Sequence, residues 1–299
     1  MTEVGANNSE RFTSPGLPLV SRRYFLRLAS TLAALGYTTQ EAGWLAADAF
    51  ASERQRPTDP NAPPPSEQSY LPILRVPPVT RNGAHVPIVA EMRHPMEPDH
   101  YIKSIQILNA SDPIPSKGIF YFSPANGQAY LSVQARMHSG ASAVQVIAEC
   151  TRHGRWTTSQ PITIPEGGGG CATAAEEGDS VPLDDAIRPP IIRIPELVER
   201  GKIRRGEIIH VQVKLKHPSR TGLALQGSTF VQTADPFYLK EMKVFYGDPL
   251  VSRYEMTPAI SDSPFITFTL RVMKESTIRI VVTNSRGQQF ETSQKVVFA

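Results

Sequence analysis

The stretch Ile209-His210-Val211-Gln212-Val213-Lys214-Leu215-Lys216 decides the fold class of this 299-residue chain. Apolar and polar side chains alternate in it with a period of two, which is the pattern of a β-strand with one buried face. Similar short segments recur along the chain, separated by turn signals such as Asn126-Gly127 and Ser139-Gly140. No strong helical period competes with them, so we predict an all-β protein built of sandwiches. Further strands are expected at 86–92, 101–108, 119–122, 130–137, 144–150 and 162–164, and at 242–246, 265–273, 278–282 and 291–298.

The strand pattern occurs twice in the same order, which predicts two related sandwiches. Gly83 precedes His94 by 94 − 83 = 11 residues, and Gly206 precedes His217 by 217 − 206 = 11 residues. We assign the first sandwich to 70–165 and the second to 193–299. The second copy carries an insertion at about 226–237. Matching pairs in the two halves are His94-Pro95 and His217-Pro218, Ser123-Pro124 and Ser263-Pro264, Ala135-Arg136-Met137 and Arg271-Val272-Met273, and Thr158-Ser159-Gln160 and Thr292-Ser293-Gln294.

The N-terminus has the pattern of an export signal. Ser21-Arg22-Arg23-Tyr24-Phe25-Leu26 is a twin-arginine motif, and the apolar run that follows at 28–36 is shorter than the roughly 20 residues that span a bilayer. The alternative is an ordinary amphipathic helix beginning at Arg22. We predict a signal segment at 1–51, a disordered Pro-rich lead-in at 52–69, and export to a bacterial periplasm by the twin-arginine route. No later segment is apolar for long enough to anchor the chain in a membrane.

Composition narrows the class of protein further. The net charge of +3 and the lack of a basic stripe interleaved with aromatic residues argue against a nucleic-acid partner. With only two cysteines, Cys150 and Cys171, an exported protein has no disulfide framework. Cys150 shares the alternating face of the 144–150 strand and is expected to be buried there. The sequence does not decide whether Cys150 and Cys171 form a single disulfide.

A run of four glycines, Gly167, Gly168, Gly169 and Gly170, leads to Cys171. Because glycine moves freely and the surrounding sequence is poor in apolar residues, we predict a flexible arm and linker over 166–192. The 171 − 164 = 7 residues between Ile164 and Cys171 could reach roughly 23 Å. That geometry suits a carrier thiol, and the alternative is an interdomain linker with an incidental cysteine. An acidic patch follows the thiol in the same segment, at Glu176, Glu177, Asp179, Asp184 and Asp185.

The remaining signals do not predict an enzyme. No basic residue adjoins Cys171, and the nearby acidic side chains would oppose its ionisation, so its chemistry would come from partner proteins. No G-x-S-x-G elbow is present, and the glycine run lacks the ending of a phosphate-binding loop. His94, His210 and His217 are interpreted as turn or strand residues, with no metal ligand and no cofactor predicted.

Several stretches match a known family in order. They are Asn82-Gly83-Ala84-His85-Val86-Pro87 and the Gly-Cys segment, then His217-Pro218-Ser219-Arg220-Thr221-Gly222, Phe245-Tyr246-Gly247-Asp248 and Thr257-Pro258-Ala259-Ile260-Ser261-Asp262-Ser263-Pro264-Phe265. On these residues the chain resembles a fused SoxYZ sulfur carrier over about 70–299, a SoxY-like half followed by a SoxZ-like half. The resemblance implies two immunoglobulin-like sandwiches and a covalent attachment site for sulfur intermediates at Cys171, with Gly167 to Gly170 as the carrier arm. It also implies partners: a haem cytochrome that loads thiosulfate, a thiohydrolase and a sulfane dehydrogenase.

The chain departs from this family in two ways. Ala172-Thr173 stands where the family has two trailing glycines, and the thiol is tethered on both sides rather than at a free C-terminus. A loop needs a wider active-site channel in a partner enzyme than a free tail does, so this arm could serve a different set of partner proteins. The alternative function is therefore a non-covalent β-sandwich adaptor for a periplasmic quinoprotein dehydrogenase or cytochrome.

Overall fold

A computed structural model describes residues 70–173 and 187–298, which fall in one compact unit. The predicted signal segment at 1–51, the lead-in at 52–69 and the acidic patch after Cys171 lie outside the described residues. No helix in the described part of the chain has the length and apolarity that crossing a membrane requires.

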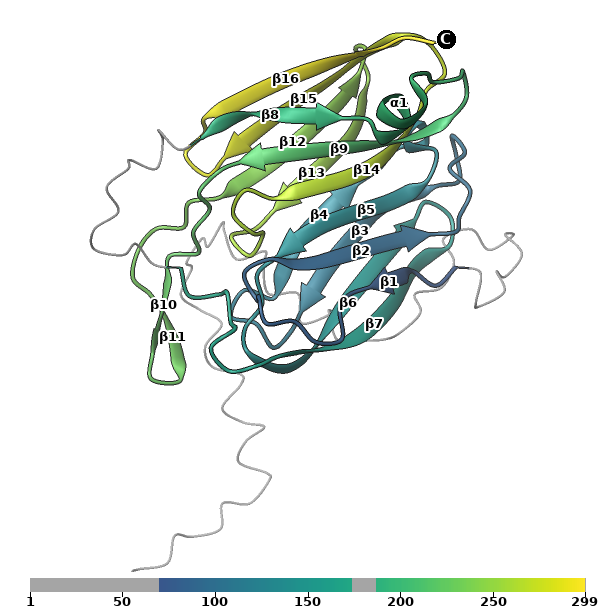
Figure 1. The fold of residues 1–299 in the computed structure, drawn as a ribbon. Helices are drawn as coiled ribbons and strands as arrows, with labels where there is room; N and C mark the ends of the chain where they lie inside the picture. Colours follow the sequence, from purple (N-terminus) through teal and green to yellow (C-terminus); the bar gives the residue numbers. More distant parts are fainter. Residues whose placement is uncertain (1–69, 174–186, 299) are drawn as a thin grey trace, which may run out of the picture. The chain divides into compact units, whose positions relative to one another are not determined.

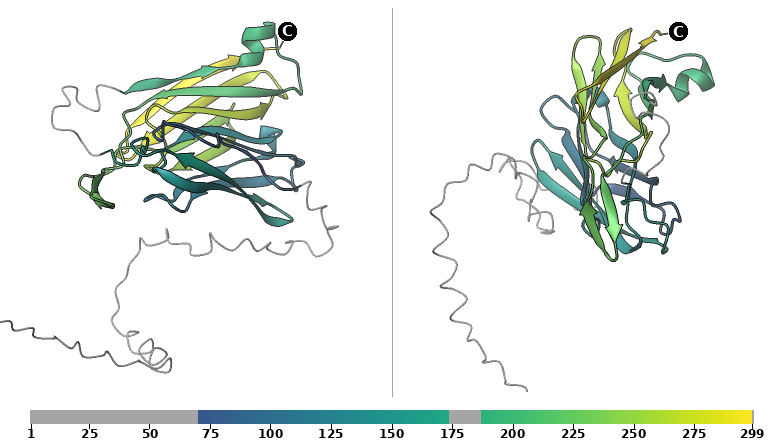
Figure 2. Two further views of the ribbon diagram at one scale, coloured as in Figure 1. Left: turned by 60° about the horizontal axis from the view of Figure 1, so that its bottom comes forward. Right: turned by 90° about the vertical axis from the view of Figure 1, so that its left-hand side faces the viewer.

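The described residues form two facing antiparallel sheets, seen as two layers in Figures 1 and 2. One sheet has six strands in the order β1-β2-β5-β14-β9-β8, and the other has eight in the order β16-β15-β12-β13-β4-β3-β6-β7. The bounds are β1 Ile73–Arg75, β2 Val86–Met92, β3 Ile102–Asn109, β4 Ser116–Tyr121, β5 Ala129–Ala135, β6 Gly140–Cys150, β7 Gly154–Ile164, β8 Arg188–Arg193, β9 Ile208–Lys216, β12 Leu239–Tyr246, β13 Leu250–Met256, β14 Phe265–Arg271, β15 Ser276–Asn284 and β16 Gln289–Val296.

Each half of the chain is a seven-stranded sandwich, as the internal repeat predicts. The first half supplies β1, β2 and β5 to one sheet and β4, β3, β6 and β7 to the other; the second half supplies the equivalent strands in mirrored order. Three strands facing four is the strand count of a constant-type immunoglobulin domain. In Figure 1 the first half is the blue and teal part and the second half is the green and yellow part. The all-β prediction is confirmed.

The two halves are joined edge to edge in both sheets. Strand β4 pairs with β13, where Phe120 lies opposite Tyr254, and β5 pairs with β14, where Ser132 lies opposite Thr267. An isolated strand edge exposes unpaired N–H and C=O groups, and this pairing satisfies them. The sandwiches therefore share two continuous sheets.

The core follows the alternation that the sequence predicts. Val211 and Val213 are fully buried on the inner face of β9, and Leu215 is nearly so. One hydrophobic cluster runs through both halves. Tyr254 lies at the junction, with its ring centroid 5.4 Å from that of Phe120 and 5.9 Å from that of Phe268. Burial on both sides of the junction holds the halves together as one unit.

The predicted linker is shorter than expected. Strand β8 begins at Arg188 and pairs with β9, so the C-terminal end of the 166–192 segment belongs to the six-stranded sheet. A short helix, α1 Pro195–Arg200, follows it. The insertion expected near 226–237 forms part of a hairpin of β10 Leu223–Gln226 and β11 Thr229–Gln232, which extends beyond the two sheets in Figure 1.

Candidate functional site

The glycine arm lies docked on the body of the protein. The N–H of Gly83 donates to the carbonyl of Gly168 over 2.7 Å, and the N–H of Gly170 donates to the carbonyl of Met137 over 2.9 Å. The N–H of Met137 in turn donates to the carbonyl of Gly83. The prediction of a freely mobile arm is wrong for this structure, because these backbone bonds hold the segment in place up to Thr173.

The glycines allow this close backbone approach. A Cβ on Gly170 would lie 2.3 Å from Cα of Ala84, and a Cβ on Gly168 would lie 2.7 Å from the carbonyl oxygen of Arg81. Both distances are too short for any side chain. Glycine here removes a steric barrier to docking, in addition to the freedom that the sequence analysis assigned to it.

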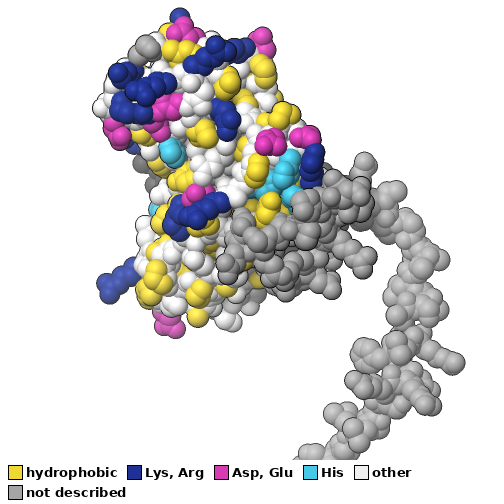
Figure 3. Space-filling model, turned by 90° about the vertical axis from the view of Figure 1, so that its right-hand side faces the viewer, with side chains coloured by type: hydrophobic (Ala, Val, Ile, Leu, Met, Phe, Trp, Pro, Cys, Tyr) yellow, Lys and Arg dark blue, Asp and Glu magenta, His cyan; other side chains and the backbone are white. Residues whose placement is uncertain are grey.

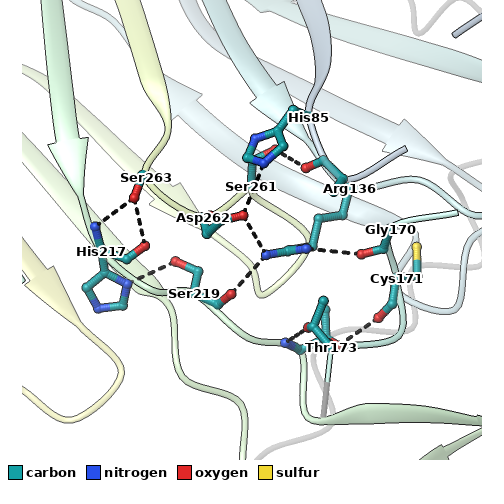
Figure 4. Close-up of polar contacts among 12 residues, drawn as sticks. His85, Arg136, Gly170, Cys171, Thr173, His217, Ser219, Ser261, Asp262 and Ser263 are labelled. Atoms are coloured by element: carbon teal, nitrogen blue, oxygen red, sulfur yellow. Dashed lines mark hydrogen bonds and ion pairs between the residues drawn. The ribbon is translucent and has the colours of Figure 1, made fainter. Parts of the chain in front are cut away.

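The buried guanidinium of Arg136 ties the arm to both halves of the protein (Figure 4). It donates to the carbonyl of Gly170 over 3.2 Å and to the carbonyl of Ser219 over 2.9 Å. It also forms an ion pair of 3.0 Å with Asp262, which lies 3.3 Å from Nε2 of His85. Arg136 extends from the end of β5 in the first half, while Ser219 and Asp262 belong to the second.

Two threonines fasten the residues around the thiol. The hydroxyl of Thr221 donates to the carbonyl of Cys171 over 2.7 Å, and the N–H of Thr221 donates to Oγ1 of Thr173 over 2.6 Å. The two hydroxyls are 2.8 Å apart. Thr173 is one of the residues by which the chain departs from the family pattern of trailing glycines, and its side chain makes a contact that glycine could not.

The thiol of Cys171 is buried, with 3% of the residue exposed. Its Sγ lies 3.9 Å from Oδ1 of Asp112, whose other oxygen forms a 2.6 Å ion pair with the buried Lys117. Burial and the nearby Asp112 carboxylate raise the pKa of the thiol to about 12, against the opposing charges of Lys117 and Arg136. The docked thiol is therefore protonated at neutral pH and is a poor nucleophile.

Both cysteines are free and lie at opposite ends of one hairpin. Cys150 ends β6 and pairs with Gly154, whereas Gly140 at the other end pairs with Ile164, from which the arm leaves. The 11 residues of β6 span roughly 33 Å at about 3.3 Å per residue. The bridge that the sequence left open is not formed, and Cys150 is buried on its strand as predicted.

The histidines considered from the sequence take different positions. His210 pairs with Glu196 over 2.7 Å, and the buried His217 lies with Nδ1 2.9 Å from Oγ of Ser219. His94 instead meets His100, Cys150 and His153, and the four ligand atoms lie within 4.8 Å of one another. We call this group, which was not predicted from the sequence, the histidine–cysteine cluster. The signal was the pair of spacings His94-x₅-His100 and Cys150-x₂-His153, both typical of zinc ligands.

Comparisons with known proteins match each half to a different family. The family model "Sulfur oxidation protein SoxY" matches residues 66–171, and "Sulphur oxidation protein SoxZ" matches residues 198–295. A comparison with curated protein sequences gave no match.

Several solved structures resemble parts of the sandwich. The superoxide reductase (neelaredoxin) from Ignicoccus hospitalis is 15% identical, with 42% of this chain and 94% of that one covered and a TM-score of 0.29. Hypothetical protein PH1083 from Pyrococcus horikoshii OT3 is 9% identical, with 42% and 96% covered and a TM-score of 0.26. The fibronectin(III)-like modules of Clostridium thermocellum CbhA are 7% identical, with 76% and 94% covered and a TM-score of 0.21.

Proposed function

We propose that this chain, which belongs to the SoxY and SoxZ families of sulfur-oxidation proteins and joins both domains in one polypeptide, is a non-catalytic carrier of sulfur intermediates. It holds thiosulfate-derived groups covalently on Cys171 and presents them to partner enzymes. The observation that carries the proposal is the place of this thiol. Cys171 is the last residue of the SoxY match and ends a glycine arm that is attached to the body by a few hydrogen bonds.

A carrier thiol of this kind works by alternating between two positions. In the docked position the thiol is shielded and its pKa is about 12. Once the arm leaves, Cys171 regains water, and its pKa returns toward the ordinary value of 9.0, which gives a larger fraction of thiolate. Because a typical hydrogen bond contributes only about 0.5–1.5 kcal/mol net, a partner that binds the extended arm can offset the loss of those that dock it.

Loading creates one sulfur–sulfur bond. The sulfur of Cys171 bonds to the terminal sulfur of thiosulfate, the thiol proton goes to solvent, and two electrons leave to an acceptor. A haem cytochrome among the partners would supply that acceptor. Hydrolytic release of sulfate by a thiohydrolase and oxidation of the remaining sulfane sulfur by a dehydrogenase would follow on the same tethered atom, in the periplasm.

The second candidate function is an adaptor that binds a periplasmic quinoprotein dehydrogenase or cytochrome without covalent chemistry. The burial of Cys171 favours it, since a thiol that never left this position would not react. In that case the two shared sheets would act only as a binding surface. The two functions differ in whether Cys171 ever forms an adduct.

Intact mass tests the proposal directly. Protein isolated from cells grown on thiosulfate should carry sulfur adducts that reductant removes and that Cys171→Ala abolishes. In vitro, tetrathionate should add one thiosulfate group to the wild-type thiol and release one thiosulfate, so no further oxidant is needed. An unmodified Cys171 under both conditions would overturn the carrier and support the adaptor.

A further inference from the structure

The histidine–cysteine cluster lies at the end of the first half that is remote from Cys171. Its members come from two places in the chain: His94 and His100 lie in the loop after β2, while Cys150 ends β6 and His153 lies in the turn between β6 and β7. His94, Cys150 and His153 are buried, and His100 is partly exposed. Figure 3, which views the molecule from the side toward which β2 runs, shows histidine side chains gathered at the surface there.

The spacing of the ligand atoms fits one metal ion. Nε2 of His94 lies 3.3 Å from Sγ of Cys150, Nδ1 of His153 lies 3.8 Å from the same sulfur, and Nε2 of His100 lies 3.1 Å from Nδ1 of His153. A tetrahedral Zn²⁺ with nitrogen ligands at about 2.0 Å and sulfur at about 2.3 Å sets its ligands about 3.3–3.6 Å apart. In the described part of the chain, no other group of three or more such side chains converges in this way.

The groups around the ligands also suit a metal. Nδ1 of His94 lies 2.6 Å from the carbonyl oxygen of Pro95, so that nitrogen carries the proton and Nε2 is left as the ligand. The N–H of Arg152 points at Sγ of Cys150 over 3.4 Å, a donor that stabilises a thiolate.

Aromatic rings shield the site from solvent. The ring of Tyr70 lies 5.3 Å from those of His94 and His153 and stacks on Trp156 at 5.2 Å. Three imidazoles and a thiol therefore meet in a mostly buried position, where only His100 is partly exposed. Buried polar side chains brought so close together are typical of a ligand set rather than of an ordinary core.

We propose that His94, His100, Cys150 and His153 bind one divalent transition-metal ion, and that the ion is Zn²⁺. Imidazole and thiolate ligands suit this ion, and a complete set of four protein ligands is typical of a structural zinc site. The ion joins the loop after β2 to the turn between β6 and β7. Binding releases the thiol proton of Cys150 to solvent. The inference does not depend on the carrier role of Cys171.

The chain offers a matched pair of cysteine variants for the test. Metal analysis of the purified full-length protein should find one equivalent of zinc in the wild type and in Cys171→Ser, and little in Cys150→Ser. After removal of the metal, added Co²⁺ should give a thiolate-to-cobalt charge-transfer band that is absent only from Cys150→Ser. The proposed site would be overturned if the charge-transfer band were lost in Cys171→Ser instead. It would also be overturned if the wild type held no metal and gave no band.

Because Cys150 is buried, its variant could fail to fold, so a second variant is needed. His100 is partly exposed, and His100→Ala should fold yet bind Co²⁺ at least tenfold more weakly. Zinc should raise the thermal midpoint of the wild type above that of the metal-free protein, and should raise it less in His100→Ala. Equal affinity in His100→Ala would overturn the ligand set, and stoichiometric iron or copper in place of zinc would overturn the choice of ion.

Discussion

The hydroxyl of Thr221 in the second half of the chain donates to the main-chain carbonyl of Cys171, the residue that ends the glycine arm, over 2.7 Å. The contact couples the two domains at Cys171, since the arm belongs to the SoxY domain and the threonine to the SoxZ domain. The SoxZ domain thus helps to hold Cys171 in its docked position.

Thr221→Val should favour release of the arm. Valine keeps the shape of threonine but leaves the buried Cys171 carbonyl without its donor, a loss of about 1–3 kcal/mol. Since about 1.4 kcal/mol corresponds to a factor of ten, we expect iodoacetamide to label Cys171 roughly ten times faster than in the wild type. The measurement is the labelling rate from intact mass at constant pH.

Thr269→Val is the matched control for that variant. Thr269 is also buried, and its hydroxyl donates to the carbonyl of Gln128 over 2.7 Å, in contact with no residue of the arm. This variant should lower the free energy of unfolding without changing the labelling of Cys171. Equal labelling rates in both threonine variants would contradict a role for Thr221 in docking.

The reactivity of Cys171 should rise with pH beyond the range of a free thiol. Because the pKa of the docked thiol, about 12, lies above the ordinary 9.0, docking is fully favoured below pH 9 and is weakened as the pH rises toward 12. The labelling rate of the wild type should therefore keep increasing above about pH 10, where a solvated thiol of pKa 9.0 is mostly ionised and its labelling rate levels off. Thr221→Val should level off at lower pH than the wild type, and a wild-type plateau at about pH 10 would show that the thiol is not held in this environment.

Gly170→Ala should prevent docking without disturbing the sandwich, because its Cβ would lie 2.3 Å from the backbone of Ala84. We expect faster labelling of Cys171 and faster proteolysis near the arm, with an unchanged circular dichroism spectrum. Gly287→Ala is the control: nothing lies within 4 Å of its Cβ, and φ is 80°, so only backbone strain of about 1–2 kcal/mol is expected. A Gly170→Ala protein that resists labelling like the wild type would contradict the docked geometry.

Asp112→Asn should destabilise the protein strongly. It leaves the ammonium of Lys117, which is fully buried, without its carboxylate partner, and breaking such a pair costs roughly 3–5 kcal/mol. Glu291→Gln removes the partner of Arg279 in an exposed pair and should cost under about 1 kcal/mol. Urea unfolding gives the free energy of unfolding of each variant. Similar losses in the two variants would contradict the buried ion pair between Asp112 and Lys117.

Alternation and the internal repeat were enough to predict the fold class and the two halves. Strand β9 lies at 208–216 as its period of two indicates, and β2 occupies 86–92 as predicted. Strand β13 was not predicted, because Val251 and Ser252 are both buried and interrupt its alternation. The register between β12 and β13 shifts at this point, because Ser252 lies opposite Val244 and Leu250 lies opposite Phe245, which leaves Val251 as an extra residue in β13.

The environment of the thiol could not be predicted in the same way. Cys171 stands out in sequence, but its burial depends on contacts with Asp112 and Thr221, which lie 171 − 112 = 59 and 221 − 171 = 50 residues away. A glycine run predicts a mobile segment, because the sequence does not show the backbone against which the glycines pack. The histidine–cysteine cluster had a local signal in Cys150-x₂-His153, and only the sheet register shows that His94 joins it.

The shared sheets have a consequence for why the two domains occupy one polypeptide. Strand pairing across the junction already holds them together, so the peptide between Thr173 and Ile187 is not what makes them associate. What a gene fusion adds is a fixed stoichiometry, because each Cys171 is synthesised in the same chain as the Thr221 that contacts it. A protease site introduced between Thr173 and Ile187 should therefore leave a nicked protein that elutes as an intact heterodimer.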